Sequence, residues 1–181
     1  MTTIQQIQSI KDLKLPLERD SFMRNVIREL SGLLEDMVGI DETEGFISVV
    51  GQHIGTQINE NYQLALNTEK FSQDQVIEIL ADLKHRIKGS FVVEEQSDKK
   101  IVFSNKDCPF AEEVKGRTSL CMMTSNVFGV IAADNLGYAK IALEKTIAKG
   151  NPECRVAIYL DANSEDTQSI EGREYFQAEK L

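Results

Sequence analysis

The sequence lacks a surplus of positive charge, and this deficit limits the partners of the protein. Its 181 residues include 20 Lys and Arg against 29 Asp and Glu, which gives a formal net charge of −9. An acidic chain has no general means of holding the phosphate backbone of a nucleic acid or the anionic surface of a membrane. We therefore expect neither nucleic acid nor membrane among its partners.

Long apolar runs and a secretory leader are also missing. No window approaches the roughly 20 uncharged residues of a membrane-spanning helix. The first residues have neither the basic nor the apolar region of a signal peptide. The three cysteines are an odd number, so a disulfide framework is not expected. Together these absences predict a cytoplasmic protein in a reducing compartment.

The length of the chain and its 41% of hydrophobic residues fit one domain that buries its own core. The sequence shows neither an internal repeat nor a low-complexity run. We expect a lead-in over residues 1–16, because Pro16 disfavours helix in the residue before it. Residues 17–160 form the predicted domain, and residues 161–181 form a polar extension that is loose or briefly helical.

Apolar side chains recur at three- and four-residue steps through the first half of the chain, which is the spacing of helices with one apolar face. This pattern predicts helices over residues 17–38, 43–66 and 72–89, each with one buried face. Gly51 and Gly55 lie inside the second helix, where missing side chains favour close packing of another helix. Ser72 is a typical N-cap for the third.

The second half of the chain changes its period. Short β-prone runs at 91–93 and 101–103 predict one hairpin, and residues 138–160 predict another around the turn at 149–152. A fourth helix is expected between the hairpins, over residues 120–136. The predicted fold class is therefore α+β, with N-terminal helices packed on an antiparallel sheet of about four strands.

Three cysteines stand on three different predicted elements. Cys108 lies in a loop, Cys121 begins the fourth helix, where the helix dipole favours a thiolate, and Cys154 opens the last strand facing inward. Three thiolates with one further ligand suit zinc, and three alone suit an iron–sulfur cluster with an open iron. Free cysteines are also among the most buried residue types, so spacing alone favours plain burial.

Apolar side chains near the cysteines are the candidates for a ligand pocket. Phe110, Met122, Met123 and Phe128 would line a pocket for a small hydrophobic ligand, although such residues more often form plain core.

Glu144, His53 and His85 are secondary candidates for a metal or an acid–base role. Strand alternation places Glu144 on the solvated face, and both histidines lie within helical patterns. The sequence contains no Ser-His-Asp ordering, no phosphate-binding loop and no zinc-protease motif, which favours a protein that is not an enzyme.

The segments Asp107–Phe110, Leu120–Gly129 and Thr146–Val156 resemble the methanogen output domain family, and further similar segments extend the resemblance over nearly the whole chain. The resemblance implies a module of prokaryotic signalling systems, often beside sensor kinases or regulators.

A more distant similarity runs to the vinyl-4-reductase domain family, whose fold group includes haem nitric-oxide sensors and acyl-binding trafficking subunits. In those relatives cysteines hold a structural zinc beside a pocket for a small aromatic or hydrophobic effector. Cys121 and Cys154 match that arrangement, whereas Thr146 stands near the place of a further cysteine. The resemblance then requires Cys108 to supply the missing thiol.

These observations predict a cytoplasmic sensory module that binds a small ligand, a metal or both through Cys108, Cys121 and Cys154, and changes conformation. Zinc or an iron–sulfur cluster is expected ahead of haem. The expected partners are a second copy in an isologous homodimer, a small hydrophobic effector, and a signalling protein such as a kinase or response regulator. The alternatives are a haem sensor with axial His53 or His85, a thiol-based redox sensor, and a metal-dependent enzyme on a small hydrophobic substrate.

Overall fold

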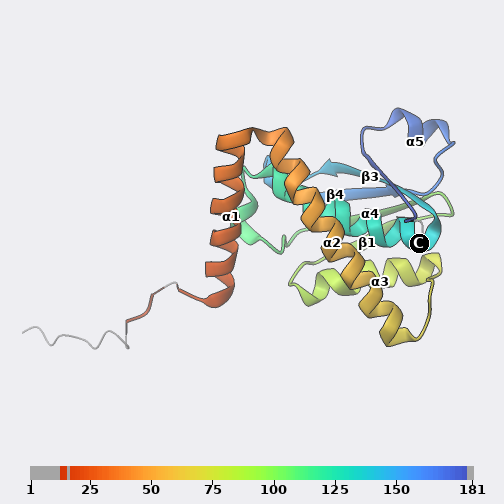
Figure 1. The fold of residues 1–181 in the computed structure, drawn as a ribbon, viewed down its shortest axis with the longest axis horizontal. Coiled ribbons are helices and arrows are strands. Elements are labelled where there is room, and N and C mark those ends of the chain that lie inside the picture. Colours follow the sequence, from red (N-terminus) through yellow and green to blue (C-terminus); the bar gives the residue numbers. More distant parts are fainter. Residues whose placement is uncertain (1–12, 16, 179–181) are drawn as a thin grey trace, which may run out of the picture.

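A computed structural model describes residues 13–15 and 17–178, so most of the predicted lead-in lies outside the described residues. The helices are α1 (Arg19–Val38), α2 (Ile40–Leu66), α3 (Gln73–Arg86), α4 (Cys121–Leu136) and α5 (Glu165–Ser169). The strands are β1 (Val92–Gln96), β2 (Lys100–Asn105), β3 (Tyr138–Lys145), β4 (Cys154–Tyr159) and β5 (Arg173–Phe176). Short 3-10 turns are η2 (Ala111–Val114), η3 (Thr118–Leu120) and η4 (Ile147–Lys149). The α+β class is confirmed (Figure 1).

The strands form one open antiparallel sheet in the order β1-β2-β4-β3-β5. The two predicted hairpins are β1–β2 and β3–β4, and they join where β2 pairs with β4. That pairing runs from Asn105 opposite Cys154 to Lys100 opposite Tyr159. It brings the start of β4 beside the loop that follows β2, and this register positions the site described below.

The fifth strand, at the edge of the sheet, is absent from the sequence prediction of about four strands. It is held by Tyr175, whose ring covers Gly129 of α4 so closely that a Cβ there would lie 2.2 Å from a ring carbon. The Tyr175 hydroxyl is 3.0 Å from Ser125 Oγ. This short strand also pairs with β3 along its length. A strand in a polar stretch that depends on contacts with distant segments has no signal in the periodicity.

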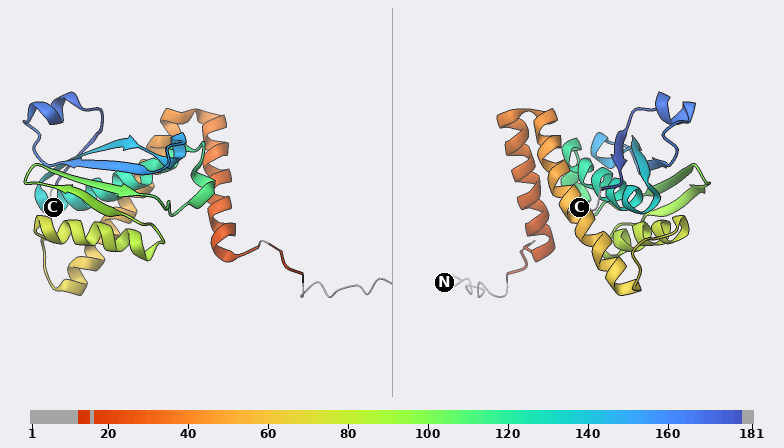
Figure 2. Two further views of the ribbon diagram at one scale, coloured as in Figure 1. Left: turned by 180° about the vertical axis from the view of Figure 1, so that it is seen from behind. Right: turned by 45° about the vertical axis from the view of Figure 1, so that its right-hand side comes forward.

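The core lies between one face of the sheet and helices α3 and α4, while α5 lies beyond the other face (Figure 2). Phe128 of α4 meets Phe91 and Phe103 edge to face, with both pairs of ring centroids 5.5 Å apart. Phe103 and Phe128 are fully buried. On the other face of the sheet, Ile170 packs against a smaller apolar cluster.

Helix α2 crosses α4 through its small residues. A Cβ at Gly51 would lie 2.9 Å from Asn126 Cβ, and a Cβ at Gly55 would lie 3.2 Å from Val127 Cα. The expected close packing of another helix at the two glycines is therefore confirmed.

The expectation that α1 and α2 bury their apolar faces is wrong for the single chain. Val50 of α2 is 49% exposed, because the small residues of that helix face α4 instead. On α1, Leu33 and Met37 are 57% and 72% exposed, and the buried residues are Ser31 and Gly32. No helix within the described ranges is both long enough and apolar enough to cross a membrane.

Candidate functional site

The three cysteines meet at one place in the fold. Cys108 comes from the loop after β2, Cys121 is the first residue of α4, and Cys154 is the first residue of β4. All three line one apolar cavity of about 30 Å³, where the start of α4 faces the β3–β4 hairpin. The backbone N–H of Ile147 donates to Cys154 Sγ at 3.4 Å. The structure thus gathers the predicted thiols from three separate elements.

Among the four apolar candidates for a ligand pocket, Phe110 lines this cavity. Met122 lines an adjoining open cleft instead, and Met123 packs between two core clusters. Phe128 belongs to the aromatic core. Helical spacing marks the apolar positions of α4, but it does not tell which of them turn toward the cavity.

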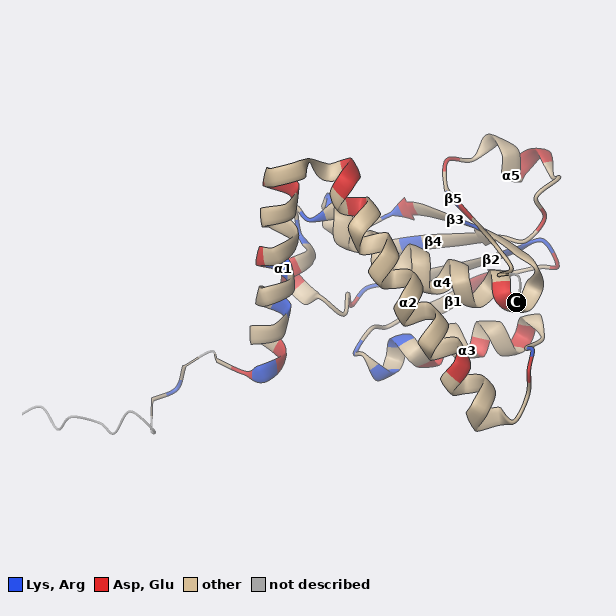
Figure 3. Cartoon of the chain, in the orientation of Figure 1, with Lys and Arg blue, Asp and Glu red and all other residues tan. Residues whose placement is uncertain are grey.

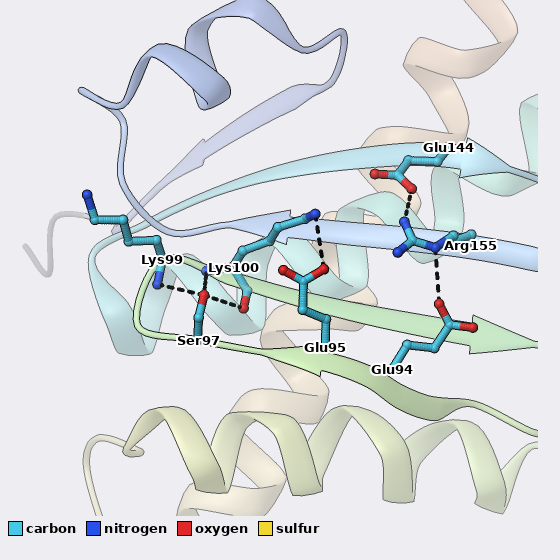
Figure 4. Close-up of polar contacts among 7 residues, drawn as sticks. All are labelled: Glu94, Glu95, Ser97, Lys99, Lys100, Glu144 and Arg155. Carbon is cyan, nitrogen blue, oxygen red and sulfur yellow. Dashed lines mark hydrogen bonds and ion pairs between the residues drawn. The ribbon is translucent and has the colours of Figure 1, made fainter.

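The three secondary candidates lie away from the cavity. Glu144 is exposed and forms an ion pair with Arg155, which also pairs with Glu94 at 3.1 Å (Figure 4). His53 on α2 and His85 on α3 are exposed. Their placement therefore gives no support to a haem or metal role at the cysteines.

As they lie, the thiols do not fit a metal centre. In the part of the chain that the structure describes, no three His, Cys, Asp or Glu side chains group closely enough to hold a metal ion. Burial, with smaller contributions from Cys154 and Cys108, raises the pKa of Cys121 to about 12, so burial outweighs the helix dipole. Burial also raises the pKa of Cys108. Zinc and iron–sulfur clusters bind thiolates, so a metal would have to displace the protons of Cys108 and Cys121.

Sequence reasoning missed Lys84, the most unusual side chain near the cavity. It lies on α3 and is 4% exposed. Its ammonium donates to Thr124 Oγ1 at 2.7 Å and lies 5.0 Å and 5.1 Å from the ring centroids of Phe91 and Phe128. Within the described residues this ammonium has no ion-pair partner. A buried cation without a carboxylate is costly, and the two rings and the hydroxyl offset that cost only in part.

The electrostatics of Lys84 reflect this setting. Burial lowers its pKa to about 8, and the nearby Cys108, Cys154 and Cys121 offset part of the shift. The side chain is therefore mostly charged at neutral pH. Its sequence signal is a four-residue step, because Lys84 continues the buried positions Val76 and Leu80 on the inner face of α3.

An open antiparallel sheet packed on helices defines a class of α+β domains found in solved structures. The phenol-responsive sensory domain of the transcription activator PoxR, solved with phenol, matches with a TM-score of 0.60 and 12% identity, over 87% of this chain and 82% of that one. Trafficking protein particle complex subunit 3 from Naegleria fowleri, covalently bound to palmitic acid, matches with a TM-score of 0.54 and 11% identity, over 78% and 95%. An Fe(II) unliganded H-NOX protein from K. algicida has a TM-score of 0.47 and 15% identity, over 77% and 97%.

Within that class, the chain belongs to the methanogen output domain 1 family, whose model matches residues 26–159. The matched range extends from within α1 to the end of β4, so it includes the three cysteines and Lys84. The family resemblance noted in the sequence is thereby confirmed. No curated protein matches the chain in sequence.

Proposed function

We propose that this domain is a sensory module that binds a small hydrophobic effector in the cysteine-lined cavity and acts on a partner by changing conformation. The observation that carries the proposal is the cavity itself, because a loop, a helix start and a hairpin each contribute to its wall. The common fold with a phenol-responsive sensory domain supports it.

The cavity must open to admit an effector. Its volume of about 30 Å³ is far below the roughly 300 Å³ or more of ligand pockets. An open cleft of about 610 Å³ adjoins it, and Cys121, Leu143 and Thr146 line both spaces. An effector that enters from the cleft separates the start of α4 from the β3–β4 hairpin. The empty and occupied domains then differ in one packing contact, which is what a population shift requires.

The wall of the cavity also contacts α1. A conformational change at the cavity can therefore be transmitted to this helix. Val114 of η2 and the preceding Phe110 line the cavity. The same turn binds α1, because Arg28 donates to the carbonyl oxygens of Glu113 and Lys115, the latter at 2.8 Å. A shift of η2 upon effector binding therefore moves α1.

The partner that we propose for α1 is a second copy of this chain. Of the 21 large hydrophobic side chains that are exposed within the described residues, seven lie on α1 and seven on α2. Helix α2 has no Lys, Arg, Asp or Glu over residues 45–59 (Figure 3). Apolar surface of this extent marks an interaction site, and an isologous pair of α1–α2 hairpins would cover it. A kinase or response regulator would then respond to a change in the dimer.

The test is an effector screen by thermal unfolding. A compound that binds only the native state stabilises it by about 2.7 kcal/mol at one hundred times its Kd. Ala148→Val fills part of the cavity and should reduce this stabilisation. Ala142→Val is the matched control, because Ala142 is also buried but belongs to the cluster on the other face of the sheet. Equal losses in both variants, or no stabilising compound at all, would contradict the proposal.

A metal ion stays the alternative occupant that the sequence predicts. The convergence of three thiols on one cavity favours it, although the thiols would have to approach one another and lose their protons. Anaerobic purification with an absorption spectrum separates haem and iron–sulfur centres from colourless zinc, and elemental analysis identifies zinc. Less than about a tenth of an equivalent of any metal would exclude the centre, as would unchanged metal content in Cys121→Ala.

A further inference from the structure

The cavity wall holds a hydrogen-bond donor that has no acceptor. Asn105 is 2% exposed, and its Oδ1 accepts from the backbone N–H of Ser90 at 2.8 Å and from Ser90 Oγ at 3.1 Å. Because the Ser90 N–H can only donate, the oxygen and nitrogen of the Asn105 amide are assigned unambiguously. Asn105 lines the cavity, and its Nδ2 has no hydrogen-bond partner within the described chain. Native proteins rarely leave such a donor unpaired without a reason.

A second donor faces the same place. Thr124 lines the cavity, and its Oγ1 accepts a hydrogen bond from the Lys84 ammonium. The hydroxyl proton of Thr124 must therefore point away from Lys84, and the adjacent positive charge polarises it. Lys84 thus adds its charge to the site from directly behind the wall that Thr124 and Phe91 form.

The charge balance of the cavity is one-sided. No Asp or Glu within the described ranges lines it. One buried ammonium, one unpaired amide donor and apolar walls remain. A buried cation calls for a counter-charge, and charge-assisted hydrogen bonds to anionic oxygen are the strong ones.

We propose that the effector is a small apolar carboxylic acid, bound as its anion with the carboxylate at Asn105 and Thr124 in front of Lys84. Its apolar part would lie against Phe110 and Val114. This inference rests on the proposed function, because it assigns the chemistry of the ligand in that same cavity. A carboxylate provides acceptors for both donors and a counter-charge for the ammonium, whereas a phenol or an alcohol leaves the ammonium unpaired.

The experiment compares benzoate with benzyl alcohol, which has similar size and no charge, by isothermal titration calorimetry on the full chain at pH 7. We expect benzoate to bind at least about tenfold more tightly. Lys84→Met should weaken benzoate by about tenfold or more and leave benzyl alcohol within about twofold. Asn105→Asp keeps the acceptor for Ser90 but places an anion at the unpaired donor, so it should abolish benzoate binding. Lys106→Met removes an exposed lysine nearby and is the control.

Thermal melting of each variant first establishes that it is folded. Benzoate that binds no more tightly than benzyl alcohol, or that binds Lys84→Met and Asn105→Asp as it binds the wild type, overturns the inference. Binding of benzyl alcohol alone overturns the anionic ligand but leaves the proposed sensory function intact. If neither probe binds, the effector screen separates the two ideas: a neutral hit overturns only the carboxylate, and no hit overturns both.

Discussion

Two apolar regions of this molecule differ in their exposure to solvent. Between α4 and the sheet, Phe103 and Phe128 are fully buried and pack edge to face. On the α1–α2 hairpin, Leu33, Met37 and Val50 are about half exposed or more. The same three- and four-residue spacing generates both regions. The difference teaches that periodicity identifies an apolar face, while the element that covers the face depends on the rest of the fold or on a partner.

The cavity lies between these two regions and connects them. Phe91 belongs both to the aromatic core and to the cavity wall, and η2 belongs both to the cavity wall and to the contact that holds α1. A ligand cannot enter an enclosed core without breaking its packing contacts. An exposed face has no intramolecular packing contacts for a ligand to change. A small cavity between them is where occupancy can alter packing at limited cost.

The largest expected effect tests the enclosed region. Phe128→Ala removes the ring that touches Phe91 and Phe103, and it should lower the free energy of unfolding by about 3–5 kcal/mol. Phe46→Ala is the matched control, because Phe46 is 55% exposed on α2. Under monomeric conditions the control should cost less than about 1 kcal/mol. Urea unfolding measures both, and similar losses would mean that the two regions do not differ.

The exposed region is tested by assembly. Leu33→Glu places a charge within the apolar face of α1, and it should raise the dissociation constant of the proposed homodimer by about a hundredfold. Sedimentation equilibrium measures the association. Ile87→Glu, at a 50% exposed position outside the α1–α2 hairpin, is the control and should change it little. A wild-type chain that is monomeric at high concentration would show that something other than a second copy covers this face.

The connecting region is tested through pH. The native pKa of Lys84 is about 8 and its ordinary value is 10.5, so the unfolded chain binds more protons between these values and stability rises with pH there. Between pH 7 and 9, the wild type should gain about 1 kcal/mol relative to Lys84→Met. The raised pKa values of Cys108 and Cys121 act in the opposite direction, lowering stability as pH rises through 9.0. Lys84→Met also removes the charge that lowers the pKa of Cys108, which adds to the relative gain of the wild type.

Urea unfolding at several pH values gives this difference. Parallel curves for the wild type and Lys84→Met would show that the ammonium is not desolvated. The region beside the cavity would then not differ from the apolar core, since it would hold no buried charge.

The spacing of apolar residues along the chain predicted those helices and hairpins that depend on neighbouring residues. Helices α1 to α4, the two hairpins and the positions of Cys121 and Cys154 at the starts of α4 and β4 follow from periodicity, capping and turn residues. The spacing did not predict the burial of Lys84, the contact of Tyr175 with α4 or the exposure of Leu33. Each of these depends on contacts between segments far apart in the chain. For Lys84 the burial pattern of α3 carried a usable signal, but a lysine at such a step ordinarily keeps its amine in solvent.

The smallest expected effect concerns Glu144, which the sequence placed among the candidates for chemistry. Its partner Arg155 also pairs with Glu94, and all three side chains are partly solvated. Glu144→Gln should therefore lower the free energy of unfolding by less than about 1 kcal/mol and leave effector affinity unchanged. Lys84→Met provides the contrast, since it should alter affinity for an anionic effector while removing a charge of the opposite sign. A tenfold loss of effector affinity in Glu144→Gln, measured by calorimetry, would mean that side chains on the outer face of the sheet influence binding in the cavity.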